Sequence, residues 1–129
     1  MANPNNTGIV IGHMTDEVKV FTNKDGSRKI MYTVAASDNF KDKDGNRGTQ
    51  FIPLEAFVRA DKADNGVYDR MHKGDAVALT YSVRNNNYTK ESGEKVYGIT
   101  LLTDAVSLLD SKATSDARQA ARAVAATEA

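Results

Sequence analysis

The chain has 129 residues, a length that fits one domain and leaves little room for a second. It holds no cysteine, which excludes disulfides and thiolate metal sites, and no apolar run approaches the roughly 18 residues needed to cross a bilayer. The 17 basic and 17 acidic residues cancel. A nucleic acid bound here would therefore need something besides net charge, because proteins that bind polyanions by charge alone are normally basic.

The first third of the chain predicts two strands and a polar loop. An apolar run with two glycines, residues 7–14, predicts a buried strand, and "VKVF" at residues 18–21 continues it after a bend. An Asp-Gly pair at residues 25–26 is a strong hairpin signal. Residues 29–37 then predict a strand, and the polar segment 38–48 predicts an exposed hairpin loop.

Residues 49–58 predict the strand that matters most for function. Strand alternation puts one apolar set on the core face: Ile52, Leu54, Ala56 and Val58. The opposite face carries a mixed set: Phe51, Pro53, Glu55, Phe57 and Arg59. Because a face with charges and a proline is not a core face, two phenylalanines point away from the interior. Phe40, on the polar loop before this strand, has no alternation by which its direction can be predicted.

The rest of the chain predicts one helix and two strands. Residues 63–74, with Val67 and Met71 four apart, predict a short helix that ends near Gly74. Residues 75–88 predict a strand, with Arg84 and Tyr88 outward and four residues inward: Val77, Leu79, Tyr81 and Val83. A turn around Gly93 leads into the last strand, residues 96–109. Five strands with a helix between the third and fourth fit the all-β OB-fold, a five-stranded Greek-key barrel, among other small barrels.

The segment 111–129 is rich in alanine, which favours helix. It has no apolar stripe that could dock on the barrel, and an isolated helix of this length is marginal in water. We therefore expect an OB-fold domain over residues 1–110 and a flexible, disordered tail over residues 111–129.

The outward aromatic residues suggest base stacking. Aromatic side chains stack on bases of any sequence, for about 1–3 kcal/mol per base, so a neutral protein can bind a single strand in this way. The alternative is an oligomer interface or a second small core, because exposed aromatic surface often marks a protein partner.

Taken in order, these motifs resemble the SSB family of bacterial and phage single-stranded DNA-binding proteins, over about residues 8–111. The matching stretches include "IVIGHM", "YTVAASDNFKDKDG", "TQFIPLEAFVRAD" and "MHKGDAVALTYSVRNNNYTKESGEKVYGITLL". The family carries four base-stacking aromatic residues, and the resemblance assigns that role here to Phe40, Phe51, Phe57 and Tyr88.

The resemblance implies sequence-tolerant binding of single-stranded DNA, which protects exposed strands in replication and recombination. Four cations would contact phosphates: Lys41, Arg47, Arg59 and Arg84. The resemblance also implies a cytoplasmic homo-oligomer that assembles partly through the first strand, as a tetramer ahead of a dimer. We expect no enzymatic activity and no cofactor. An OB-fold protein–protein module and an RNA-binding OB protein remain open as alternatives.

The chain also departs from the family pattern. It has no tryptophan, which reduces the stacking area at each site, and asparagines occupy residues 85–87, where the family is often basic. It ends "AATEA" instead of the acidic tip that recruits replication and repair proteins, which favours a phage or plasmid origin.

Metal binding and catalysis are not expected. The stretch "NFKDKDGN" fails as an EF-hand loop, because placing Gly45 at position six puts Phe40 at position one, where an oxygen ligand is required. His13 and His72 have no second ligand at metal-binding spacing. No nucleophile elbow or phosphate loop is present either.

Overall fold

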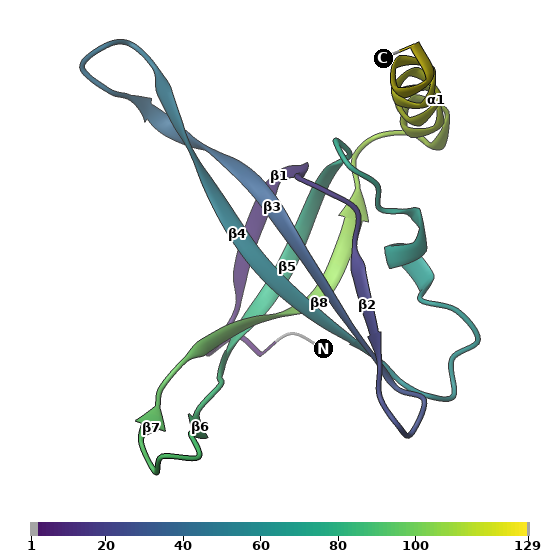
Figure 1. Ribbon diagram of the computed structural model, residues 1–129. Coiled ribbons are helices and arrows are strands. Elements are labelled where there is room, and N and C mark those ends of the chain that lie inside the picture. Colours follow the sequence, from purple (N-terminus) through teal and green to yellow (C-terminus); the bar gives the residue numbers. More distant parts are fainter. Residues whose placement is uncertain (1–2, 129) are drawn as a thin grey trace.

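Strand pairing in the computed structural model, which describes residues 3–128, closes a five-stranded barrel (Figure 1). Its strands are β1 (Gly8–Met14), β3 (Arg28–Lys41), β4 (Arg47–Val58), β5 (Ala76–Asn85) and β8 (Ile99–Leu108). The strand order is β1-β5-β8-β4-β3, and β1 pairs with β3 to close the ring. β2 (Lys19–Thr22) pairs only with β3, along its first four residues. The predicted OB-fold is thereby confirmed.

Closure depends on a glycine in β1. His13 lies opposite Ala35 where β1 meets β3. A Cβ atom added at Gly12 would lie 2.1 Å from the carbonyl oxygen of Ala35, so only glycine lets the two backbones approach this closely.

The core forms where the inward faces of the strands meet. It includes the residues of β4 that alternation placed there, with Leu54, Ala56 and Val58 buried and Ile52 packed at the margin. β3 contributes Ile30 and Val34, and β5 contributes Val77 and Leu79. Each large apolar side chain of this kind stabilises the fold by roughly 1.5–3 kcal/mol when fully buried. The core fixes the direction of β3 and β4, and with it the direction of their outer faces.

One predicted core residue is wrong. Val83 is 40% exposed, whereas its neighbour Ser82 is only 4% exposed. The pairing register between β5 and β8 shifts at this point. Thr80 lies opposite Ala105, but the next residue, Tyr81, lies opposite Thr103, so Asp104 is skipped. A bulge of this kind disturbs the alternation and twists the strands, and it coincides with the point where β5 turns away from the core.

The predicted polar loop at residues 38–48 is mostly strand. β3 runs to Lys41 and β4 begins at Arg47, so only residues 42–46 form the turn. The Asp42 carboxylate accepts hydrogen bonds from the backbone N–H groups of Asp44 and Asn46, both at 2.9 Å. Gly45 supplies the positive φ that the turn requires. The hairpin therefore projects well beyond the barrel (Figure 1), and we call residues 37–50 the β3–β4 arm.

A second, smaller hairpin projects between β5 and β8. β6 (Tyr88–Thr89) pairs with β7 (Lys95–Val96), and we call residues 86–98 the β6–β7 arm. Tyr88 was predicted at the end of the fourth strand, but the ladder with β8 ends at Asn85. The two arms leave the barrel in different directions (Figure 1).

The predicted helix over residues 63–74 is a short 3₁₀ turn, η1 (Gly66–Arg70), at the expected place between β4 and β5. It ends early because Met71 takes an extended conformation and buries its side chain in the core. Gly74 is not the cap of this turn but lies three residues beyond the C-cap residue.

Residues 111–129 were expected to be disordered, but α1 (Lys112–Glu128) is helical. The helix docks through a polar face. The guanidinium of Arg118 bridges Asp75 at 2.8 Å and Asp110 at 3.1 Å, and the Ser115 hydroxyl donates to Asp75 at 3.0 Å. In the described part of the chain, no helix is long and apolar enough to cross a membrane.

Candidate nucleic-acid interface

Phe51 and Phe57 lie on the outer face of β4, as strand alternation predicted. They are 67% and 60% exposed. Ala35 of β3 lies opposite Phe51 and leaves that ring uncovered, while Lys29 lies opposite Phe57. Six residues separate the two rings, which corresponds to roughly 20 Å along the strand. They are therefore too far apart to hold the same base.

Phe40 extends this line onto the β3–β4 arm. It is 63% exposed and belongs to β3 rather than to a loop. It lies five residues beyond Ala35, or roughly 17 Å further along the hairpin than Phe51. The three phenylalanines thus mark a path of roughly 35–40 Å along one hairpin.

The tip of the arm carries two opposed cations. Lys41 and Arg47 face each other across the strands, and both are exposed. Like charges directly opposite each other destabilise a β pair. The Arg47 guanidinium makes only a long contact, 3.5 Å, to the carbonyl oxygen of Asp38. A phosphate lying between the two side chains would relieve this repulsion.

Two of the three acidic residues of the arm, Asp38 and Asp42, are engaged within the hairpin. The Asp42 carboxylate accepts the backbone hydrogen bonds of the turn, and the Asp38 carboxylate accepts the Gln50 amide at 3.3 Å. Both contacts hold these carboxylates to their own hairpin, so they do not pair with Lys41 or Arg47 in this conformation.

Arg59 follows directly after β4, two residues beyond Phe57. Its guanidinium lies 3.5 Å from the Asp61 carboxylate, with both side chains mostly exposed, at 75% and 68%. Exposed ion pairs of this kind contribute little to stability. The guanidinium is therefore able to exchange the carboxylate for a phosphate at small cost.

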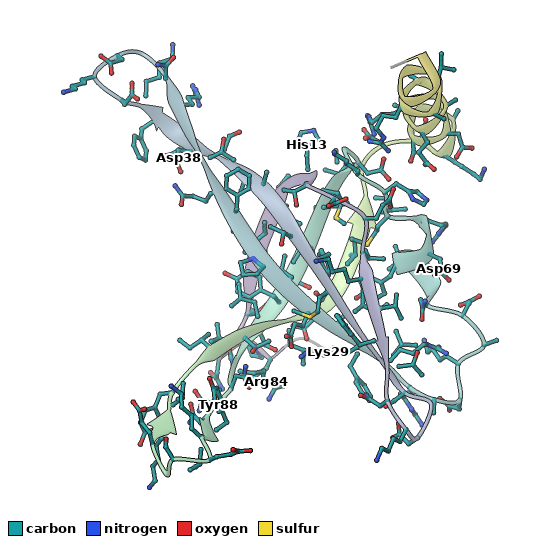
Figure 2. The ribbon with its side chains drawn as sticks, in the orientation of Figure 1. His13, Lys29, Asp38, Asp69, Arg84 and Tyr88 are labelled. Atoms are coloured by element: carbon teal, nitrogen blue, oxygen red, sulfur yellow. The ribbon has the colours of Figure 1, made fainter. Side chains whose placement is uncertain are left out.

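Arg84 and Tyr88 form a separate group (Figure 2). Arg84 lies in β5 opposite Thr100, at the base of the β6–β7 arm, and Tyr88 lies opposite Val96 within that arm. Tyr88 is 54% exposed. The structure therefore divides the eight predicted residues between the β3–β4 hairpin and the β6–β7 region, and does not gather them into one patch.

A groove lies between these two groups. It has a volume of about 380 Å³ and is lined on one side by outer-face residues of β3 and β4, including Met31, Pro53 and Glu55. Its other lining residues include Ile99 at the start of β8, directly after the β6–β7 arm. Phe51, Phe57 and Tyr88 do not themselves line the groove.

Sequence reasoning missed Tyr97 on the β6–β7 arm. It is 76% exposed, the most exposed of the large hydrophobic residues. Strand alternation could not identify it, because β7 has only two residues and ends at Val96. The usable signal was a second tyrosine on the far side of the turn that follows Tyr88.

No group of three histidine, cysteine, aspartate or glutamate side chains in residues 3–128 is placed to hold a metal ion. His72 instead bonds the Glu17 carboxylate at 3.0 Å and ties two loops together. Burial raises the pKa of Tyr32 and of Tyr68, whose rings pack 6.0 Å apart. Both hydroxyls therefore stay protonated, as structural groups do.

Comparison with known proteins gives a consistent result. The sequence model of the single-strand binding protein family matches residues 5–109. A single-stranded DNA-binding protein of Lactiplantibacillus plantarum is 28% identical over 116 residues, which cover 90% of this chain and 56% of that protein. Single-stranded DNA-binding protein 1 of Staphylococcus aureus strain MSSA476 is 26% identical over 88% of this chain and 71% of its own length. The chain thus spans little more than half of the first relative.

Among solved structures, the crystal structure of a mitochondrial single-stranded DNA-binding protein from S. cerevisiae superposes with a TM-score of 0.57. The alignment covers 81% of this chain and 94% of that one, at 17% identity. At this level of identity the likeness supports the fold.

Proposed function

Because the chain belongs to the single-strand binding protein family, we propose that it binds single-stranded DNA with little regard to sequence. Bases stack on Phe40, Phe51, Phe57 and Tyr88, and phosphates contact Lys41, Arg47, Arg59 and Arg84. The observation that carries the proposal is the line of exposed phenylalanines along the β3–β4 hairpin, with opposed cations at its tip.

Stacking supplies most of the binding energy in this proposal. Four stacked bases contribute roughly 4–12 kcal/mol, at about 1–3 kcal/mol each. A micromolar complex needs about 8 kcal/mol, and ordering the strand and the side chains consumes part of the total. The zero net charge of the chain is compatible with this arrangement, because bases of any sequence present a flat face.

We extend the proposal to the setting of the protein. Residues 1–110 form the DNA-binding domain of a homo-oligomer, a tetramer ahead of a dimer. It covers exposed strands during replication and recombination in the cytoplasm of a bacterium. The protein carries out no chemical step of its own.

The first strand supports the oligomer. Ile9 and Ile11 of β1 point outward and are 70% and 61% exposed. They lie opposite Thr80 and Ala78 of β5, so the neighbouring side chains on this outer face are small. Exposed apolar surface of this kind often marks a protein interface.

The direct test is a titration of fluorescently labelled oligo-dT. We expect the double variant Phe51→Ala/Tyr88→Ala to bind at least tenfold more weakly than the wild type, since two stacking contacts of about 1–3 kcal/mol each are lost. The matched control is Leu109→Ala/Val124→Ala. It removes two exposed apolar side chains at and near α1, and it should bind as the wild type does.

The same titration separates the alternatives. A wild-type protein that binds no oligo-dT at low salt would contradict the proposal and favour a protein–protein module. Competition by an RNA oligomer of equal length, at equal concentration, would indicate an RNA-binding protein instead.

A further inference from the structure

Phe21 is an exposed aromatic residue on β2. It is 51% exposed, and all four residues of β2 are exposed, because this strand lies outside the barrel and pairs only with β3. Phe21 is not among the residues that form or flank the core. Packing within the described chain therefore does not account for it.

Strand register places Phe21 on the same face as Phe57. Phe21 lies opposite Lys29 of β3, and Lys29 lies opposite Phe57 of β4. Residues directly opposite each other in an antiparallel pair project from the same face of a sheet. The two rings are separated by two strand spacings, or roughly 10 Å, so each can stack on a base of its own.

The surroundings of Phe21 suit a nucleotide. Lys29 lies between Phe21 and Phe57 in the strand register, and its ammonium group contacts the Glu55 carboxylate at 3.0 Å, in a pair that is partly exposed. Lys19 and Met31 lie opposite each other in the neighbouring row, and both line the groove described above. A ring flanked by two lysines offers both a stacking surface and phosphate contacts.

We propose that Phe21 is a fifth base-stacking residue, which extends the DNA path from Phe57 across β3 to the β2 edge. Lys19 and Lys29 contact the phosphates on either side of the stacked base. This inference rests on the proposed function, and its occupant is the continuation of the strand already stacked on Phe57. The register makes the face continuous from Phe57 to Phe21. Lys19 and Lys29 lie on it with Glu55, and Asp16 and Glu17 line the neighbouring groove.

The first test uses oligo-dT of increasing length, within the 4–16 nucleotides that one OB-fold covers. We expect Phe21→Ala to bind the longest oligomer about five- to 150-fold more weakly, which corresponds to the loss of one stacked base. The shortest oligomers do not span all five platforms, so their affinity should not change. Phe21→Tyr should retain full affinity.

The matched control is Val20→Ala. Val20 is the neighbour of Phe21 on β2, is also exposed, and projects from the other face of the strand. Its truncation should not change affinity at any length. A length-independent loss in Phe21→Ala, or an equal loss in Val20→Ala, would overturn the assignment.

A second measurement separates this inference from the proposed function. The chain has no tryptophan, so Phe21→Trp and Phe51→Trp each create a protein with a single tryptophan. We expect the fluorescence of both variants to be quenched when a long oligo-dT binds. Quenching at residue 51 without quenching at residue 21 would refute the role of Phe21 and leave the proposed function intact. Absence of binding by either variant and by the wild type would refute both.

A protein interface at β2 would give a different result. In that case Phe21→Ala would lower the molecular mass measured by light scattering without DNA, and its affinity for oligo-dT would be unchanged at every length. That outcome would also overturn the assignment.

Discussion

Lys41 and Arg47 are the two residues of the β3–β4 arm to which we assign phosphate contacts. The two cations face each other across the strands, while the nearby carboxylates of Asp38 and Asp42 are held by hydrogen bonds within the hairpin. The repulsion between Lys41 and Arg47 destabilises the free protein slightly. Binding of a phosphate would turn that cost into an attraction.

The salt dependence of binding measures this effect. The four cations of the proposed function give a slope of log K against log salt of about −3, at about −0.7 per contact for a single strand, and contacts from Lys19 and Lys29 would bring it to about −4. Lys41→Ala should make the slope less negative by about 0.7. Lys112→Ala, on α1 and away from both arms, is the control that should leave it unchanged. A wild-type slope steeper than about −6 would contradict a mechanism in which stacking dominates.

Among the elements, α1 depends on a few polar contacts made with distant parts of the chain. Arg118 joins it to Asp75 before β5 and to Asp110 after β8. The Arg122 guanidinium donates to the carbonyl oxygen of Lys73 at 2.6 Å. Since an isolated helix of this length is marginal in water, these contacts decide whether it forms.

We therefore expect Arg118→Met to release the helix. The circular dichroism signal at 222 nm should fall, and amide exchange over residues 112–128 should accelerate while the barrel strands stay protected. Lys112→Met breaks only an exposed pair with Asp116 within the helix and should preserve both signals. Equal loss in the two variants would show that Arg118 has no special role.

Acid should release the same helix. The backbone N–H of Ala76, aided by the Arg118 guanidinium, lowers the pKa of Asp110 below its ordinary value of 3.8. A carboxyl with a lowered pKa contributes stability that is present above its ordinary value and lost as pH falls through the lowered one. Helix content should therefore be constant from pH 8 to pH 5 and fall below about pH 4. A loss of helix above pH 5 would contradict this account.

The elements also show where sequence alone was sufficient. The faces of β4 were predictable from Ile52 to Val58, because one side of the strand packs on the core there and alternation carries the information. The exposure of Val83 was not predictable, because the register shift lies in the pairing with β8 and not in the sequence of β5. Docking of α1 was missed because its partners, Asp75 and Asp110, are polar and leave no apolar stripe on the helix, and because Asp75 lies 43 residues from Arg118 in the sequence.

Across the whole molecule, the outer face of β1 bears on the proposed assembly. The double variant Ile9→Lys/Ile11→Lys places two charges on the outer face of β1. It should reduce the mass measured by light scattering, because charges buried between two copies of the chain would lack partners. Val124→Lys, at an exposed position on α1, should leave the mass unchanged. A wild-type protein that is already monomeric, or a double variant of unchanged mass, would contradict assembly through β1.

The divergence of the two arms has a mechanical consequence. A polymer that reaches from Phe40 on one arm to Tyr88 on the other has to change direction at the barrel (Figure 1). Double-stranded DNA has a persistence length of about 50 nm and resists such a corner, whereas an unpaired strand is far more flexible. On the proposed path, selection for single strands therefore comes from the stiffness of the ligand as well as from access to its bases. Two complementary strands could not rejoin along this route without first straightening away from one of the arms.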